Sequence, residues 1–186
     1  MILPRAFYNR ATVEVARALL GTVLVHEETA GRIVETEAYL GGDDLASHSA
    51  AGITDRTRVI FGPPGHAYVY LSYGMHDCLN IVAEPRGTPG CVLIRALEPL
   101  TGLDIMRARR PRARSDRDLA SGPGKLTRAM GITRLHSGAD MTRGNLVVQT
   151  GESEIVEVAV APRIGITKCA DWPLRFYIPG NPFVSR

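Results

Sequence analysis

Long apolar segments are missing from this sequence. Its longest apolar runs, residues 19–25 and 91–94, are far shorter than the ~20 residues that a membrane-spanning helix needs. The N-terminal residues also lack the apolar core of a signal peptide. We therefore expect no membrane partner, and we expect the protein to be cytoplasmic, associated with the nucleoid in a prokaryote, or nuclear.

Cysteine is scarce, and the patterns that bind metals are missing. The cysteines are Cys78, Cys91 and Cys169. They form no C-x-x-C pair for zinc, and their odd number argues against a full disulfide framework. His48 with Asp43 and Asp44 lacks the spacing of a known ligand set. We expect reduced thiols that pack as small hydrophobic groups, no metal and no other cofactor.

Lysine is scarcer still, because arginine supplies all but two of the 22 basic residues. This bias reflects either genomic base composition or a need for planar, bidentate donors. The net charge of +3 is too small to establish a nucleic-acid partner by itself. Residues 121–125 (SGPGK) lack the pattern of a phosphate-binding loop, which argues against a nucleotide hydrolase. Lys125, at the expected start of a helix, either holds one phosphate of a nucleic acid or is solvated.

The composition is that of an ordinary globular chain. With 186 residues, 45% of them apolar and 22% charged, the chain can bury a core and is not intrinsically disordered. It contains no internal repeat and no low-complexity segment. We predict one domain over residues 1–186.

Helical patterns are few. Apolar residues between Val13 and Leu20 recur at near-helical spacing until Gly21 ends the pattern. A second helix is expected over residues 103–110, with Thr101 as its N-cap, and a third begins near Pro123.

Strand patterns dominate the rest of the chain. The expected strands cover residues 22–26, 32–40, 67–71, 79–83 and 91–97, and short strands follow Asn145. Residues 29–31 are expected to form the turn between the first two strands, and residues 41–65 a loop. Because strands and helices do not alternate regularly, the pattern predicts an α+β fold rather than a parallel sheet.

The most informative strand is residues 33–40 (IVETEAYL). Side chains alternate on a strand, so Glu35, Glu37 and Tyr39 share one face while the residues between them face the core. Two neighbouring carboxylates repel each other when both are ionised, so either a pKa is raised or a cation lies nearby. Either outcome suits a general base. The alternative is an ordinary half-exposed strand whose polar face is solvated.

Aromatic residues gather after this strand. Tyr68 and Tyr70 share a face of their own strand, whereas Tyr73 lies at an expected turn. Planar rings such as Tyr39, His48 and Tyr70 can sandwich a nucleobase. A protruding Tyr73 can fill the space that a base leaves when it is extracted from a stack. The alternatives are a core tyrosine pair and a hydrogen-bonded loop histidine.

Several motifs in one order carry a resemblance to a known family. They are IVETEAYL (33–40), ASHS (46–49), YVYLSYGM (68–75), Asn80, VLIRALEP (92–99), Ser121-Gly122-Pro123 with Lys125-Leu126, and PLRFY (173–177). Together they closely resemble the alkyladenine DNA glycosylases, also called 3-methyladenine DNA glycosylases or methylpurine glycosylases. The resemblance extends from about residue 20 to the end of the chain.

This resemblance implies both a fold and an activity. The fold is a single compact α+β domain around a curved, mainly antiparallel sheet with flanking helices. The activity is base-excision repair on double-stranded DNA that contains damaged purines. Such an enzyme flips alkylated or deaminated purines (3-methyladenine, 7-methylguanine, hypoxanthine or ethenoadenine) out of the duplex and hydrolyses the N-glycosidic bond. The resemblance also implies a monomer, and the segment that matches residues 163–166 lines the base pocket.

The resemblance assigns two residues to the chemical step. Glu37 matches the general base that activates a water for attack on the sugar, and Arg95 matches a residue that helps hold that water. Neither Lys125 nor Lys168 belongs to a catalytic motif of the family, so we expect a monofunctional glycosylase without strand cleavage.

The resemblance assigns five residues to binding of the extruded base. Tyr39, His48 and Tyr70 match the aromatic walls that stack on it. Asn80 matches a pocket residue that disfavours the 2-amino group of normal guanine. Tyr73 matches the side chain that inserts through the minor groove and fills the vacancy.

Two other functions stay open. One is a nucleic-acid-binding module that kept this fold and lost catalysis. The other is a carbohydrate glycosidase that uses Glu35 and Glu37, although both carboxylates point to one side, whereas an inverting pair should flank the bond. Six arginines between Arg107 and Arg117 are either a phosphate grip or a solvated loop.

Overall fold

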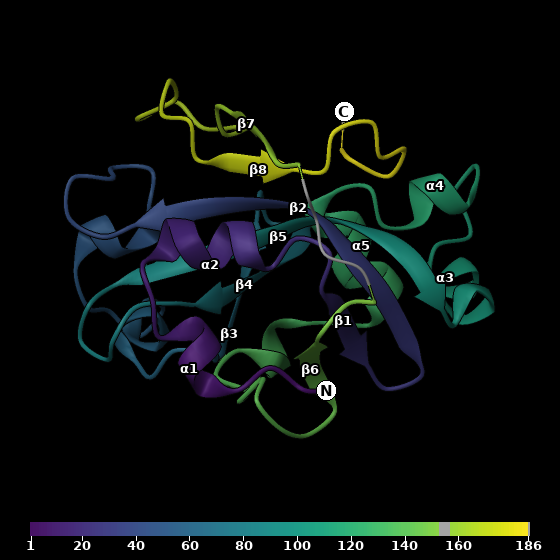
Figure 1. Ribbon diagram of the computed structural model, residues 1–186, viewed down its shortest axis with the longest axis horizontal. Coiled ribbons are helices and arrows are strands. Elements are labelled where there is room, and N and C mark those ends of the chain that lie inside the picture. Colours follow the sequence, from purple (N-terminus) through teal and green to yellow (C-terminus); the bar gives the residue numbers. More distant parts are fainter. Residues whose placement is uncertain (153–156, 186) are drawn as a thin grey trace.

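The chain folds around a curled antiparallel sheet (Figure 1). The computed structural model describes residues 1–152 and 157–185. The main path of the sheet, in spatial order, is β3 (Ala67–Ser72), β4 (His76–Val82), β5 (Gly90–Thr101), β2 (Thr29–Leu40), β1 (Val23–His26) and β6 (Leu146–Gln149). The helices and the sheet together confirm the predicted α+β class.

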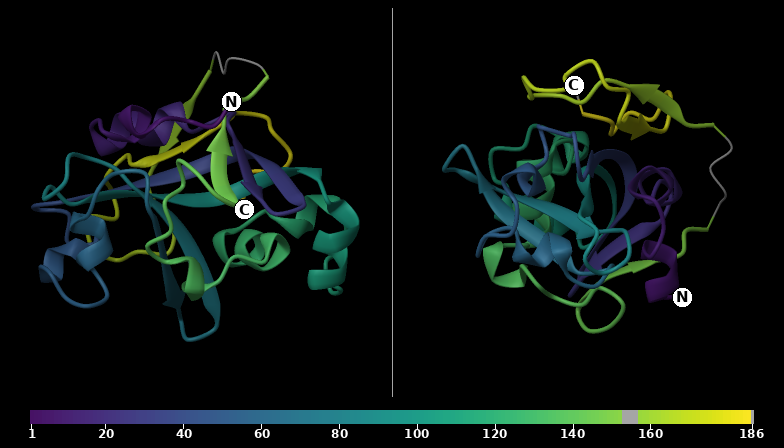
Figure 2. Two further views of the ribbon diagram at one scale, coloured as in Figure 1. Left: turned by 90° about the horizontal axis from the view of Figure 1, so that it is seen from below. Right: turned by 90° about the vertical axis from the view of Figure 1, so that its left-hand side faces the viewer.

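The long strand β2 organises this sheet. One of its edges pairs with β5, and the other pairs with β1 near its start and with β8 (Arg175–Tyr177) further along. β8 pairs in turn with β7 (Ala159–Ala161), so a C-terminal hairpin covers the second half of β2. This hairpin and the segment that follows it, in yellow-green and yellow, lie along the top of the molecule in Figure 1 and in the right-hand view of Figure 2.

Short helices cover the sheet. They are α1 (Arg5–Tyr8), α2 (Thr12–Ala18), α3 (Leu103–Arg109), α4 (Asp116–Leu119) and α5 (Pro123–Met130), with 3-10 turns at η1 (His48–Ala51), η2 (Arg58–Phe61) and η3 (Arg134–His136). In Figure 1, α1 and α2 lie in front of the sheet, while α3 and α4 follow the far end of β5. α2 packs on β2 and β5, and α5 packs on β4 and β5.

Alternation along β2 decides what each of its faces meets. Thr36 donates a hydrogen bond to the carbonyl of Ala16 in α2 (2.8 Å), and Ala38 belongs to the same apolar core. The side chains of Glu35 and Glu37 contact Arg95 instead. One face of the sheet therefore packs on the core under α2, and the other face is free to form a polar site.

Three local predictions need correction. The turn between β1 and β2 is at Glu27 and Glu28, not at residues 29–31, because Thr29 already pairs with His26. Thr101 is the last residue of β5, and Gly102 precedes α3 with a φ of +74°, a conformation open to glycine at little cost. The helices α1 and α4 were not expected, since a single turn leaves almost no periodic signal.

The remaining local predictions agree with the structure. The helix before Gly21, the loop over residues 41–65, the helix that begins at Pro123 and the short strands after Asn145 are all present. Among the described residues, no helix combines the length and the apolar character that crossing a membrane requires.

Candidate active site

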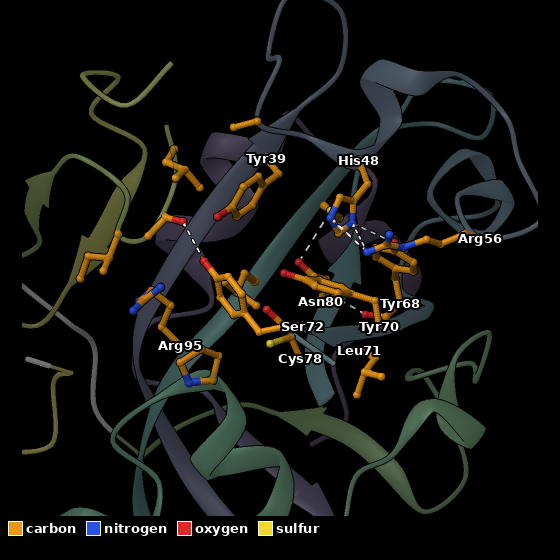
Figure 3. A pocket seen from close by; sticks show the side chains of 18 residues that line it. Tyr39, His48, Arg56, Tyr68, Tyr70, Leu71, Ser72, Cys78, Asn80 and Arg95 are labelled. Atoms are coloured by element: carbon orange, nitrogen blue, oxygen red, sulfur yellow. Dashed lines mark hydrogen bonds between the residues drawn. The ribbon is translucent and has the colours of Figure 1, made fainter. Parts of the chain in front are cut away.

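A cavity of about 530 Å³ opens beside β3, β4 and β5 (Figure 3). Its wall comes from strands, from the loop after β2 and from a segment near the C-terminus. The lining residues include Tyr39, His48, Arg56, Tyr68, Tyr70, Tyr73, Cys78, Asn80, Cys91, Arg95, Ile164 and Gly165. Aromatic rings with a few convergent polar groups are typical of a site for a planar ligand.

Glu35 and Glu37 on β2 have no exposed surface. The interpretation of this strand as half-exposed, with a solvated polar face, is therefore wrong. The cationic partner that the carboxylate pair requires is Arg95 on β5, whose Nη1 lies 3.2 Å from Glu37 Oε1 and whose Nε lies 3.4 Å from Glu35 Oε1. A sheet neighbour from a distant part of the sequence thus makes this buried pair tolerable.

Two hydrogen-bond donors and one ion-pair partner surround the carboxylate of Glu37. Tyr39 donates its hydroxyl to Oε2 (2.9 Å), the backbone N–H of Ile164 donates to Oε1 (2.8 Å), and Arg95 completes the set. Burial raises the pKa of Glu37 above its ordinary value, while Arg95, Ile164 and Tyr39 oppose this rise. The surroundings therefore hold a carboxylate of raised basicity in a fixed orientation, as a general base requires.

Glu37 itself does not line the cavity. The three residues that bond to it, Tyr39, Arg95 and Ile164, do line it. The carboxylate is therefore one layer of residues behind the cavity wall.

The aromatic residues form a cage, as Figure 3 shows. Tyr68 and Tyr70 are stacked with ring centroids 5.6 Å apart, and His48 meets Tyr70 edge to face at 4.5 Å. His48 Nδ1 lies 2.9 Å from the hydroxyl of Tyr68. Tyr39 lies across the cavity from these rings (Figure 3). The predicted rings Tyr39, His48 and Tyr70 therefore line the same cavity. The alternative contacts are also present, because Tyr68 and Tyr70 form a stacked pair and His48 lies within hydrogen-bond distance of the Tyr68 hydroxyl.

Asn80 lies at the base of this cage. It is buried, its side-chain amide donates to the carbonyl of Tyr68 (3.3 Å), and the thiol of Cys91 lies 3.8 Å from its carbonyl oxygen. The strand neighbours thus hold the Asn80 amide in one orientation.

Tyr73 lies at the tip of the β3–β4 hairpin, as expected. Its side chain is 82% exposed, and its φ of +49° is unusual for a residue other than glycine. Gly74 follows with a φ of +68°. A protruding aromatic ring on a turn that disfavours it is a feature associated with functional sites.

Sequence reasoning left the segment 163–166 without an assigned residue, and here Ile164, Gly165 and Ile166 line the cavity. A fully buried ion pair anchors this segment: Arg163 contacts both carboxylate oxygens of Asp44, at 2.7 and 2.8 Å. The guanidinium of Arg163 also lies 4.6 Å from the centre of the Tyr39 ring. Asp44 follows a Gly-rich turn and carries no local signal of this partner.

Arg56 was also missed. Its guanidinium approaches His48 Nε2 at 3.2 Å and lies 5.3 Å from the centre of the Tyr70 ring (Figure 3). Burial and, second, the charge of Arg56 lower the pKa of His48 to about 4. His48 is therefore neutral near pH 7, and a cation borders the cage.

Lys125 lies outside the residues that line this cavity, at the start of α5, and its Nζ is 2.5 Å from Asp118. In the arginine cluster, Arg107 pairs with Asp104 and Asp116. Arg110 donates to the carbonyl of Leu119. Part of this basic charge is thus partnered within the chain.

The cysteines agree with the prediction of unpaired thiols. Cys78 and Cys91 are buried, Cys169 is half-buried, and all are free. Burial raises the pKa of Cys91 to about 12, so this thiol is unreactive near neutrality. In the part of the chain that the structure describes, no group of three or more His, Cys, Asp or Glu side chains could hold a metal ion.

The sequence is similar to known proteins over nearly its whole length. A family model described as "Methylpurine-DNA glycosylase (MPG)" matches residues 6–182. A protein of Methanoculleus marisnigri is 53% identical over 193 residues, which cover 100% of both chains. A protein of Koribacter versatilis is 52% identical and covers 98% of this chain and 92% of its own. Both are named "Putative 3-methyladenine DNA glycosylase".

Proposed function

The chain belongs to the methylpurine-DNA glycosylase family and is a DNA glycosylase, and from this premise we propose how it acts. It flips alkylated or deaminated purines out of duplex DNA and hydrolyses their N-glycosidic bond with a water that Glu37 activates. The substrates are 3-methyladenine, 7-methylguanine, hypoxanthine and ethenoadenine. The enzyme acts as a monomer of one domain, without a metal or another cofactor.

The aromatic cage takes the extruded base. Tyr39 lies opposite His48 and Tyr70, and because the rings of His48 and Tyr70 are nearly perpendicular, only one of these two can stack face to face on the base. A cationic alkylated purine gains additionally from the electron-rich faces of these rings. Asn80, held in one orientation by Tyr68, projects a polar group at the edge of the base and disfavours the 2-amino group of guanine.

Glu37 carries the chemical step. Departure of the base leaves oxocarbenium character on the sugar, and an ionised carboxylate both stabilises this charge and removes a proton from the attacking water. Because Glu37 is behind Tyr39, Arg95 and Ile164, the water must reach it between these residues once the nucleotide is bound. Arg95 lines the cavity and touches Glu37, so it can hold this water.

Tyr73 fills the space that the base leaves. Extrusion costs stacking and pairing free energy, and an inserted side chain offsets part of it. The exposure of Tyr73 at the mouth of the same cavity supports this role. Lys125 contacts a DNA phosphate only if it exchanges its ion pair with Asp118.

Strand cleavage through a Schiff base needs an amine at the sugar. The two lysines, Lys125 and Lys168, are absent from the lining of the cavity, which supports a monofunctional enzyme. We expect that borohydride added during turnover traps no covalent enzyme–DNA adduct. A trapped species would contradict the assignment.

One observation carries the proposal: Glu37, a buried carboxylate of raised pKa, is held by three residues that line an aromatic cavity. The test is release of free base from duplexes with one hypoxanthine or one 3-methyladenine, for wild type, Glu37→Gln and the control Glu98→Gln. Glu98 lies on β5 and pairs with Arg32 outside the cavity. We expect release by wild type and the control, and a loss of at least about 100-fold in Glu37→Gln.

Duplex binding by Glu37→Gln, measured by fluorescence anisotropy, separates lost chemistry from lost affinity. Undiminished release by Glu37→Gln would reject Glu37 as the base. Binding of damaged duplex without release by wild type would mean that the chain is a binding module of this fold.

A further inference from the structure

We propose that Glu35 is a positioning residue for the reaction. Glu35 orients Arg95 between the buried carboxylates of Glu35 and Glu37, so that both carboxylates share the positive charge of Arg95. The inference rests on the proposed function, in which Glu37 is the base. Glu35 does not line the cavity, and the chemistry described above gives it no role.

The contacts of Glu35 come from three distant parts of the chain. Its Oε1 accepts a hydrogen bond from Arg175 Nη1 on β8 (2.9 Å) and lies 3.4 Å from Arg95 Nε on β5. Its Oε2 accepts a hydrogen bond from the backbone N–H of Ser185 (2.8 Å). A carboxylate with no exposed surface thus joins β5, β8 and the C-terminal segment at the back of the active site.

Arg95 is shared between the carboxylates through different nitrogens. Nε faces Glu35 and Nη1 faces Glu37, while Nη2 approaches the hydroxyl of Ser185 at 3.5 Å. The contact with Glu35 is an ion pair without a hydrogen bond from Nε, and it draws one edge of the planar guanidinium toward Glu35 while Nη1 stays beside Glu37. Glu35 therefore determines which face of Arg95 meets the second carboxylate and the cavity.

The same arrangement tunes Glu37 electrostatically. The groups that face Glu37 are Glu35 and Tyr39 on its own strand, Arg95 on β5, Arg175 opposite it on β8, and Arg163 with the N–H of Ile164 in the segment near the C-terminus. Burial raises the pKa of Glu37, Arg95 opposes this most strongly, and the charge of Glu35 raises the pKa further. Two carboxylates and the two arginines Arg95 and Arg175 make the cluster of ion-paired side chains neutral.

Two substitutions should therefore move the acid limb of the rate in opposite directions. In Glu35→Gln, Arg95 interacts with Glu37 alone, so the pKa of Glu37 falls and the acid limb moves to lower pH. In Arg175→Met, Glu35 keeps only Arg95 as its cation, so less of the charge of Arg95 stabilises ionised Glu37. The acid limb of this variant moves to higher pH. Each shift should be about one pH unit.

Glu35→Asp separates position from charge. The shorter side chain keeps the negative charge but withdraws from Arg95. We expect an acid limb close to that of wild type and a single-turnover rate lower by about 10- to 100-fold, the typical cost of displacing a catalytic group by about 1 Å. Glu98→Gln, which also removes a carboxylate paired with an arginine, should change neither quantity.

The experiment measures single-turnover base release from a hypoxanthine duplex between pH 4.5 and pH 9, with the fold of each variant checked by circular dichroism. Superimposable pH profiles of wild type, Glu35→Gln and Arg175→Met would overturn the inference and leave Glu35 a purely structural residue. If Glu35→Gln does not fold, the direction of the shift in Arg175→Met and the rate of Glu35→Asp decide. An inactive wild type would instead refute the proposed function.

Discussion

The buried ion pair between Asp44 and Arg163 offers a sharp test of how the active site is held together. Both side chains have no exposed surface, and the two contacts of 2.7 and 2.8 Å make the pair bidentate. Asp44 also accepts hydrogen bonds from the backbone N–H groups of Leu40 (2.9 Å) and Ala46 (3.2 Å). One carboxylate therefore anchors the loop after β2 to the segment that lines the cavity.

Asp44→Asn removes the charge and keeps the shape. The guanidinium of Arg163 then stays buried without an anionic partner, and it keeps the carbonyl of Ala38 (3.0 Å), the face of Tyr39 and at most one amide oxygen of the substituted side chain. Breaking a buried ion pair on one side costs about 3–5 kcal/mol. Since the amide oxygen of the substituted side chain can still accept a backbone hydrogen bond, we expect about 3 kcal/mol, at the lower end of this range. At 2–4 °C per kcal/mol for a chain of this length, the Tm should fall by about 6–12 °C.

Urea denaturation followed by circular dichroism measures the loss of unfolding free energy directly. Arg163→Met in the Asp44→Asn background provides the matched control, because it removes the unpaired charge as well. We expect the double variant to recover part of the lost stability, since a buried pair of apolar or neutral groups carries no uncompensated charge. Base release should fall in Asp44→Asn, because Ile164 next to Arg163 donates to Glu37.

A loss of unfolding free energy in Asp44→Asn smaller than about 1 kcal/mol, the range of an exposed ion pair, would contradict a structural role of this buried pair. A double variant less stable than Asp44→Asn alone would show that packing by Arg163, rather than its charge, matters.

Three further outcomes follow from the site. Tyr73→Ala should leave the Tm unchanged, because the ring is 82% exposed, while release of hypoxanthine from duplex falls on the order of tenfold and release from single strands changes little; an equal loss on both substrates would contradict insertion into the stack. Because only ionised Glu37 accepts a proton, base release should fall with a slope of one proton as the pH drops through the pKa of Glu37, which burial raises above 4.5. A kcat/KM profile whose acid limb has its midpoint at or below pH 4.5 would contradict this expectation. Arg56→Gln should raise the pKa of His48 from about 4 toward its ordinary 6.5, without reaching it because His48 stays buried, and NMR titration of His48 checks this shift. Because the variant also removes a cation beside the cage, release of cationic 7-methylguanine should increase relative to release of neutral hypoxanthine, which competition between the two substrates measures.

Much of the fold follows from local rules that the sequence contains. Alternation places Tyr68 and Tyr70 on one face of β3, and their rings do stack. A tyrosine followed by glycine after a strand predicts the exposed turn at Tyr73. The helix at Pro123 begins where proline fits the first helical turn. These features depend on neighbours a few residues away, so a single sequence suffices to predict them.

The motifs also determined the family and, through it, the candidate residues. What they left open at Glu35 and Glu37 was whether the strand face is solvated or buried, because the same alternation fits both. The structure buries both carboxylates under Arg95, the β8 strand and residues near the C-terminus. Burial and the choice of an ionic partner depend on which distant segments pack together, and a strand pattern contains no information on this.

The same reason explains the residues that were missed. Arg163 pairs with Asp44 across 119 positions of the chain, and Arg175 pairs with Glu35 across 140. The ion pair between Lys125 and Asp118 likewise has no signal in the sequence. The sequence by itself determined the strands, the turn at Tyr73 and the type of chemistry. The tertiary structure alone decided which charges meet, because desolvation and Coulomb attraction act through space and not along the chain.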